Sequence, residues 1–249
     1  MNLINEIKSH IESHYPIIYL ITQEDDQANH LIDNVLEDDD RKKIEWSLGC
    51  GRVHYKTTNP IGEYANFENT FSTLIMEDLT NHVIIIRDAH IALKEPLAVA
   101  RLKALVNKFS ADDEAHVTVI MIGSEANIPY ELEKLITLFD LPLPDREKID
   151  SILDEFANAY EITIDAEIKQ KLNYSLQGLS YQEIVLLLTR SYQNDGDIDD
   201  KDVTLIQHQK AQIIKKSGIL EMVNVAEKFS DIGGLKKLKP WLEQKSKII

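Results

Sequence analysis

The residues best suited to chemistry in this sequence are the charged pair Arg87-Asp88, which follows the apolar run Val83–Ile86. Four consecutive β-branched residues predict a strand buried on both faces, as at the centre of a parallel sheet. Open α/β sheets bind ligands beyond the carboxyl ends of such strands, and many nucleotide hydrolases hold magnesium there with an aspartate. Asp88 is therefore a Walker-B-like metal candidate. The alternative, which we favour because isolated motifs predict function poorly, is that Asp88 caps the next turn or pairs with Arg87.

The sequence after the first predicted strand, Ile17–Ile21, does not form a phosphate loop. Such a loop requires G-x-x-x-x-G-K-[ST], because its glycines let backbone amides face the phosphates and its lysine supplies the countercharge. Thr22–Ala28 contains neither glycine nor lysine and carries three carboxylates. Acids at this place favour a helix N-terminus, whose dipole stabilises negative charge. We expect no triphosphate binding in this region.

Three other groups of residues could bind metal or react, and each has a simpler interpretation. His10 and His14 are four apart on a predicted helix but have no third ligand at a suitable spacing. Cys50 lies between glycines with His54 near only in sequence, which favours an ordinary loop cysteine over a nucleophile. The acidic run 38–40 lacks the twelve-residue calcium-loop pattern and is interpreted as a solvated turn.

Length and composition indicate an ordinary globular chain. The 249 residues are 43% hydrophobic and 28% charged, and no apolar run approaches the roughly 18 residues that a membrane span needs. The single cysteine, Cys50, excludes an internal disulfide. A cytoplasmic setting is therefore expected.

The net charge of −15 is unevenly distributed along the chain. Residues 206–249 contain nine lysines and four acidic residues, so the rest of the chain carries a net charge of −20. The strongly acidic part of the chain before residue 206 repels phosphates, which argues against nucleic-acid binding. The lysines of 206–249 alternate with apolar residues, as in a helical connector.

The predicted elements change character near residue 144. Before it, apolar strands alternate with helices, which is typical of a parallel α/β sheet. After Pro142 and Pro144, only helices are expected, separated by Gly178 and Asn194-Asp195-Gly196. We therefore predict an α/β lobe over 1–144, a small all-helical lobe over 145–205, and a helical connector over 206–249. The predicted strands are Ile17–Ile21, Ile44–Leu48, Val83–Asp88, Val117–Ile122 and Ile136–Leu141, and a tight turn at Gly49–Gly51 leads from the second of them into Val53–Tyr55. The predicted helices are Asn2–His14, a helix that opens at Thr22–Asp26 and runs through Val35, Phe67–Leu79, Pro96–Phe109, Arg146–Tyr160, Asp165–Ser175, Tyr181–Gln193 and Asp199–Lys216.

These features together resemble a known family. An α/β lobe that leads through Leu141–Glu147 into a helical lid containing Gly178-Leu179-Ser180 is similar to the AAA+ ATPase module, a P-loop-NTPase-like fold. The segment Phe229–Leu235, followed by Leu238–Leu242, resembles the lead-in to a conventional AAA module. The resemblance covers essentially the whole chain and is to the N-terminal half of the chloroplast-reading-frame type of AAA protein, from plastids, cyanobacteria and other bacteria. Further matching segments are Tyr15–Tyr19, Trp46-Ser47 and Lys215–Glu221.

Compared with active AAA modules, the catalytic residues are missing. Ala89 stands where the base would follow Asp88, Ser124 is only a weak match for the polar sensor, and the stretch Pro129–Thr137 contains no arginine finger. The resemblance therefore implies a degenerate AAA+ fold without catalysis.

The resemblance implies a non-catalytic N-terminal region of an AAA+ ATPase that serves assembly, regulation or partner binding. The parent protein would bind ATP and Mg²⁺ through a downstream module, and this chain alone would hold no cofactor. Asp231, Ile232 and Gly233 would contribute only at the adenine end of that site. Expected partners are the downstream module, further copies of the chain, and a protein substrate or regulator, with neither nucleic acid nor membrane. The alternatives are a stand-alone AAA-like adaptor, with Trp241 as an anchor, or a hydrolase that uses Asp88 without a phosphate loop.

Overall fold

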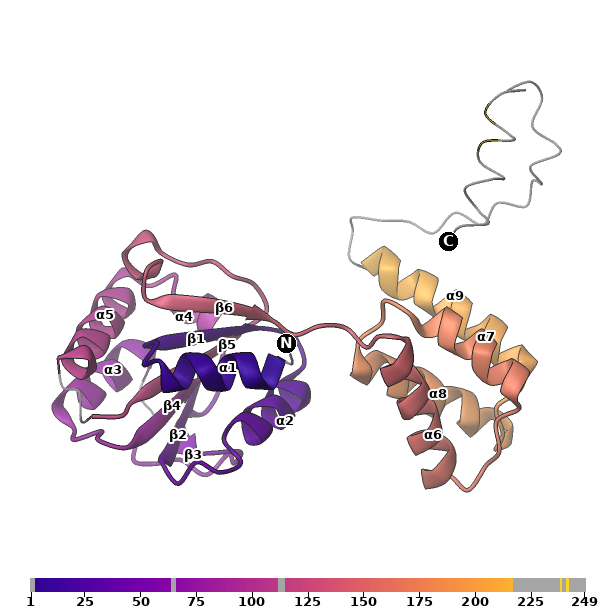
Figure 1. Cartoon of the computed structure of the whole chain (residues 1–249), viewed down its shortest axis with the longest axis horizontal. Coiled ribbons are helices and arrows are strands. Elements are labelled where there is room, and N and C mark those ends of the chain that lie inside the picture. The colour runs from indigo at the N-terminus through magenta and orange to yellow at the C-terminus, as the bar shows by residue number, and fades with distance from the viewer. Residues whose placement is uncertain (1–2, 64–65, 112–114, 217–237, 239–240, 242–249) are drawn as a thin grey trace. The chain divides into compact units, whose positions relative to one another are not determined.

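The computed structural model describes residues 3–63, 66–111, 115–216, 238 and 241. The chain divides into two compact units, an α/β lobe from the N-terminus to Leu143 with Ser180–Gln182, and a helical lobe from Pro144 onward. Figure 1 shows the sheet and its helices in one unit and a group of helices in the other. The mixed α/β class with an all-helical second lobe confirms the predicted fold class.

The α/β lobe is built on a six-stranded sheet in the order β3-β2-β4-β5-β1-β6. All neighbouring strands are parallel except β2 and β3, whose antiparallel pairing joins Ile44 to His54. The sheet is parallel as predicted apart from the edge strand β3, because the short turn after Ser47 permits only a hairpin. The strands are β1 (Ile17–Ile21), β2 (Lys42–Ser47), β3 (Gly51–His54), β4 (His82–Ile86), β5 (Thr118–Gly123) and β6 (Ile136–Asp140).

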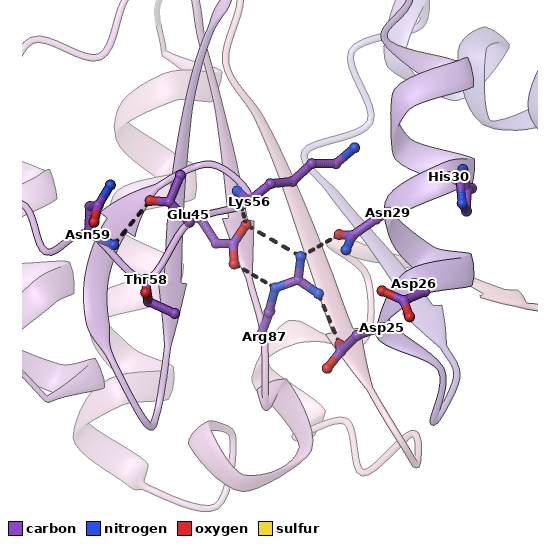
Figure 2. A pocket seen from close by; sticks show the side chains of 10 residues that line it. Asp25, Asp26, Asn29, His30, Glu45, Lys56, Thr58, Asn59 and Arg87 are labelled. Carbon is purple, nitrogen blue, oxygen red and sulfur yellow. Dashed lines mark hydrogen bonds and ion pairs between the residues drawn. The ribbon is translucent and has the colours of Figure 1, made fainter. Parts of the chain in front are cut away.

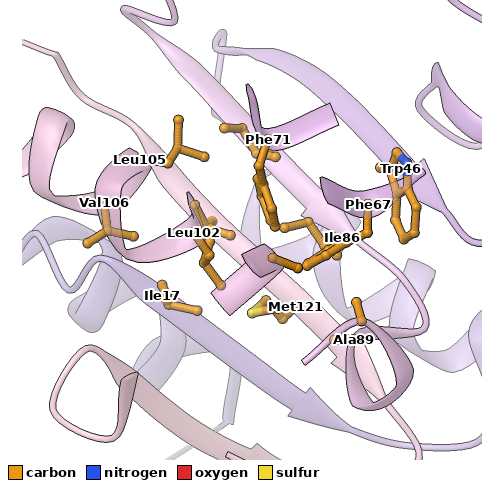
Figure 3. Close-up of a cluster of buried hydrophobic side chains, with 14 of the residues drawn as sticks. Ile17, Trp46, Phe67, Phe71, Ile86, Ala89, Leu102, Leu105, Val106 and Met121 are labelled. Carbon is orange, nitrogen blue, oxygen red and sulfur yellow. The ribbon is translucent and has the colours of Figure 1, made fainter. Parts of the chain in front are cut away.

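Helices cover both faces of this sheet, as the alternation of buried side chains requires. On one face, Ile18 and Leu20 of β1 pack with α1 (Leu3–Glu12) and α2 (Asp25–Val35). On the other face, Ile17 and Tyr19 belong to a second core, part of which Figure 3 shows. That core contains residues of α3 (Phe67–Met76), α4 (Ala89–Ala92), α5 (Pro96–Ser110) and the short 3₁₀ helix η1 (Tyr130–Leu132).

The strand β4 occupies a central position in the sheet, and Val83–Ile86 are all buried. The apolar run therefore predicted both the strand and its place. The strand ends at Ile86, two residues earlier than expected, because Asp88 adopts a left-handed backbone conformation with φ 54°. Such a φ is uncommon for a residue other than glycine and interrupts an extended chain. The helix α4, which begins directly after Asp88, was not predicted.

The helical lobe contains four helices among its described residues: α6 (Arg146–Ala159), α7 (Ala166–Leu176), α8 (Tyr181–Asp195) and α9 (Asp200–Lys216). The side chains of Asp145 and Asp165 cap α6 and α7 by accepting hydrogen bonds from the amides of Lys148 and Glu167, each at 2.8 Å. Aspartate is among the preferred N-cap residues, and the predicted starts at Arg146 and Asp165 lie within one residue of the observed ones. Helix α9 continues across the predicted 205/206 boundary without interruption. None of the described helices is long and apolar enough to cross a membrane.

Candidate functional site

The candidate site lies where parallel strands of the α/β lobe end, beginning with the connection from β1 to α2. The hydroxyl of Thr22 accepts a hydrogen bond from the amide of Glu24 at 3.0 Å, which forms a tight turn without glycine. Glu24 is the N-cap residue of α2, but its side chain makes no capping hydrogen bond. Asp25 and Asp26 follow in the first turn of the helix. Carboxylates therefore occupy the helix terminus that would face phosphates in a phosphate loop.

Arg87 fastens this acidic helix start to the sheet (Figure 2). Its Nε donates to Glu45 Oε1 at 2.6 Å, Nη1 to Asp25 Oδ1 at 2.9 Å and Nη2 to Asn29 Oδ1 at 2.5 Å. Burial of the Arg87 guanidinium disfavours its charged form, but hydrogen bonds and charge from Glu45 and Asp25 outweigh burial and raise its pKa. The arginine is therefore a permanent cation that joins α2 to the ends of β2 and β4.

A polar hollow of about 640 Å³ opens beside Arg87. Its floor includes Glu45, whose side chain is 7% exposed and whose Oε2 also accepts the Lys56 amide at 3.1 Å. Lys56 pairs through its ammonium with Asp33, which also accepts a hydrogen bond from the Tyr55 hydroxyl at 3.1 Å. Burial and the charge of Asp33 raise the pKa of Tyr55. The charges of Arg87, Glu45 and Lys56 at this hollow are already paired within the protein. The hollow is therefore lined by an internal ionic network and does not form a phosphate cradle.

Asp88, the Walker-B-like candidate, points toward the turn between β2 and β3. Its Oδ2 accepts a hydrogen bond from the Leu48 amide at 3.0 Å. Asp88 is the N-cap residue of α4, but its side chain makes no cap hydrogen bond there, and Arg87 pairs with Glu45 and Asp25. Asp88 therefore occupies the predicted capping position through its backbone, whereas its side chain bonds to Leu48 and not to Arg87. Among the described residues, no group of three His, Cys, Asp or Glu is placed to hold a metal ion.

The end of β5 is filled by a buried tyrosine. The hydroxyl of Tyr19 donates to the Glu125 carbonyl at 2.7 Å and lies directly over Gly123. Ser124, the weak sensor candidate, donates its amide hydrogen to His90 Nδ1 at 3.4 Å. Burial, with a further contribution from the negative charge of Glu125, raises the pKa of Tyr19 to about 12. The space between β1, β5 and α4 is therefore occupied by protein side chains.

The raised pKa of Tyr19 predicts a loss of stability at alkaline pH. A folded-state pKa of about 12, against 10.0 for an ordinary tyrosine, stabilises the fold fully below pH 10 and loses this effect between pH 10 and 12. At pH 11 the loss is about 1 kcal/mol. Between pH 8 and pH 11, the free energy of unfolding measured in urea should fall by about 1 kcal/mol less in Tyr19→Phe than in the parent protein. Equal decreases in both proteins would contradict the assignment, since Tyr55 is present in each.

The other sequence candidates are not brought together by the structure. His10 contacts the rings of Tyr15 and Phe139, whereas His14 lies 5.8 Å from His116 between ring centroids. The Cys50 amide donates to Ser47 Oγ at 3.2 Å in the turn before β3.

In the acidic run 38–40, Asp39 pairs with Arg41 at 2.7 Å. Burial disfavours the charged form of the Asp39 carboxyl, but hydrogen bonds and charge from Arg41 outweigh it and lower its pKa. Asp231, Ile232 and Gly233 lie outside the described residues.

Comparison with protein families decides the family of this chain. The sequence profile described as "SpoVK-like AAA ATPase, N-terminal domain" matches residues 3–141, and that of the second domain matches residues 147–217. The chain belongs to the SpoVK-like AAA ATPases. The suspected AAA+ resemblance is thereby confirmed.

Relatives of this SpoVK-like chain include AAA domain-containing proteins named ycf46. The protein from Pyropia yezoensis is 28% identical over 251 residues, covering 99% of this chain and 50% of the relative. The protein from Trieres chinensis is 29% identical over 250 residues, covering 98% and 49%. The chain therefore spans about half the length of the relatives that it matches.

Solved structures support the same fold for this SpoVK-like chain. Domain III of the Thermotoga maritima replication initiation protein DnaA aligns with a TM-score of 0.52 and 12% identity, over 83% of this chain and 88% of that domain. C. elegans PCH-2 aligns with a TM-score of 0.53 and 15% identity, over 85% and 69%. At such identities the likeness concerns the fold alone.

Sequence reasoning missed the central residues of the site, Glu45 and Tyr19. Glu45 occupies an inward position of a predicted strand, where a lone carboxylate would signal a buried cation nearby. That signal was present in the sequence, but nothing identified Arg87 as the cation. Tyr19 is indistinguishable from other apolar positions of β1 until β5 is placed beside it.

Proposed function

We propose that this chain is a non-catalytic region of an AAA ATPase and that the parent protein hydrolyses ATP through a downstream module. The supporting observation is the connection between β1 and α2. There, Asp25 begins the helix and is held by Arg87 at 2.9 Å, where a phosphate loop would present amides and a lysine. Carboxylates at this position repel a triphosphate, so the lobe would retain the architecture of the family without its nucleotide chemistry.

The role left to such a lobe is structural. We propose that it positions the downstream module, supports assembly with further copies, or receives a protein substrate or regulator. Asp231, Ile232 and Gly233 would touch only the adenine end of the neighbouring site, where ATP and Mg²⁺ bind. The division into residues 1–144, 145–205 and 206–249 and a cytoplasmic or stromal setting belong to the same proposal. The half-length match to the relatives supports a further module.

Titration of the 249-residue chain with ATP and Mg²⁺ tests the proposal. We expect no saturable heat and a change in Tm below about 1 °C at 5 mM nucleotide. A site with a Kd of about 50 μM would add about 2.7 kcal/mol under these conditions, which raises Tm by several degrees. Saturable, magnesium-dependent binding that is lost in Asp88→Ala would refute the proposal and establish Asp88 as a metal ligand.

The stand-alone adaptor is the second candidate function, and its basis is the exposed Trp241, whose relative exposure is 53%. The coding sequence after Ile249 separates the two. A downstream G-x-x-x-x-G-K-[ST] motif supports the ATPase parent, whereas a stop codon without that motif supports the adaptor.

A further inference from the structure

The helical lobe contains a second polar hollow, of about 370 Å³, between the start of α6 and the length of α7. All of its lining residues belong to this lobe. They are Arg146, Asp150, Ala166, Lys169, Gln170, Asn173, Tyr174 and Gln177. No residue of this hollow took part in the α/β site described above.

The wall between α6 and α7 is fixed by Asn173. Asn173 is only 8% exposed. Its Nδ2 donates to the Arg146 carbonyl at 2.8 Å and to Asp150 Oδ1 at 2.7 Å. The amide therefore holds the first turn of α6 against α7 and satisfies one oxygen of the only carboxylate that lines the hollow. A hollow with such a wall is preorganised to bind a ligand.

Unused hydrogen-bond donors remain around this wall. The Nε2 atom of Gln177 is buried and has no hydrogen-bond partner. Within the described part of the chain, the Arg146 guanidinium has no hydrogen bond or ion pair, whereas Lys169 is held by Asp154 at 2.7 Å. A buried donor without an acceptor is unfavourable, so a bound acceptor would relieve it. A ligand with acceptor oxygens would satisfy the free donors of the hollow.

The charge of the lobe restricts that ligand to a weakly charged anion. The described part of the lobe, residues 144–216, contains nine basic and 14 acidic side chains, which disfavours a doubly charged phosphate. In the hollow itself, Arg146 supplies the positive charge, because Lys169 is already paired with Asp154. Tyr174, which is 70% exposed at the rim, offers a ring for an apolar group beside the anion. A single carboxylate attached to an apolar or aromatic body fits these features best.

We propose that this hollow binds a carboxylate, with Arg146 and Gln177 as its donors and Tyr174 packing against the attached apolar group. An arginine suits this task, because its planar guanidinium matches a carboxylate with two parallel hydrogen bonds. The carboxylate site does not depend on the proposed scaffold role, since it involves only the helical lobe.

Titration of the whole chain with phenylacetate, followed by NMR of the Gln177 and Asn173 side-chain amides, tests the site. We expect saturable shifts with a Kd on the order of 1 mM, as for a ligand of this size. Arg146→Gln should weaken binding about tenfold or more, because it removes a charge-assisted hydrogen bond. Gln177→Met should also weaken it. Lys148→Gln makes the same charge change on α6 outside the hollow and should leave the Kd unchanged.

Two further probes test the chemical assignment. The neutral amide phenylacetamide should not saturate the shifts, and inorganic phosphate should bind more weakly than phenylacetate. Tighter binding of phosphate, equal binding of the neutral amide, or an equal loss in Lys148→Gln and Arg146→Gln would each overturn the proposal. The absence of any saturable shift at 20 mM phenylacetate would do the same. Arg146→Gln and Lys148→Gln should retain the parental Tm, because the side chains that they replace are exposed. Gln177→Met should have an equal or higher Tm, because it removes a buried donor that has no acceptor.

Discussion

Replacing Arg87 by methionine is expected to lower the free energy of unfolding of the α/β lobe by about 3–5 kcal/mol. The Arg87 and Glu45 side chains are only 11% and 7% exposed and lie 2.6 Å apart between Nε and Oε1. Without the guanidinium, Glu45 is left as an uncompensated charge inside the protein. The contact of Arg87 with Asp25 contributes less, because that carboxylate is 73% exposed. Urea unfolding followed by fluorescence of the buried Trp46, in a Trp241→Phe background, measures the loss.

The second member of the pair supplies the control for this expectation. Glu45→Gln combined with Arg87→Met should recover at least half of the loss, because the neutral amide can still accept the Lys56 amide hydrogen. Lys171→Met, which breaks a half-exposed pair with Glu167 and Asp200, should change the stability far less than Arg87→Met, because exposed ion pairs contribute little. A double variant no more stable than Arg87→Met would show that Arg87 acts through packing and not through the charge of Glu45.

The sequence predicted an element wherever the local pattern of residues was enough to determine its type and its burial. Val83–Ile86 could only be a central strand, because four β-branched residues in succession leave no polar face for solvent. The starts of α6 and α7 were also predicted to within one residue, and there Asp145 and Asp165 act locally as caps. The turn before β3 was predicted, but the antiparallel pairing of β3 was not, because its four residues, Gly51–His54, alternate too briefly to show a direction.

The candidate site was less predictable, because its contacts join residues far apart in the chain. Arg87 meets Glu45 across 42 positions and Asp25 across 62. A sequence motif depends on the spacing of residues along the chain, whereas this ionic network depends on which strands are neighbours in the sheet. Sequence reasoning could therefore establish that a phosphate loop is missing after β1, but it could not identify the residues that replace it. The left-handed conformation of Asp88, which turns its carboxylate toward Leu48, was hidden for the same reason.

Gly123→Ala is expected to destabilise the α/β lobe by about 3 kcal/mol, through overpacking at the end of β5. A Cβ at this position would lie 2.2 Å from the Tyr19 hydroxyl oxygen and 3.1 Å from the His90 amide nitrogen. Tyr19 cannot withdraw, because it is fully buried and its hydroxyl is held by the Glu125 carbonyl at 2.7 Å. The same urea titration measures the effect. Gly49→Ala, with nothing within 4 Å of the added carbon, is the matched control and should be nearly neutral.

A second substitution shows whether the tyrosine hydroxyl is the cause. Tyr19→Phe alone should cost about 1 kcal/mol, for the lost hydrogen bond to Glu125. Combined with Gly123→Ala it should remove most of the clash, so the double variant should be more stable than Gly123→Ala alone. Additive losses would instead place the conflict at the His90 backbone. In either case, the glycine at the end of β5 is required by a side chain that fills this edge of the sheet, which is the edge where active members of the fold class bind their ligands.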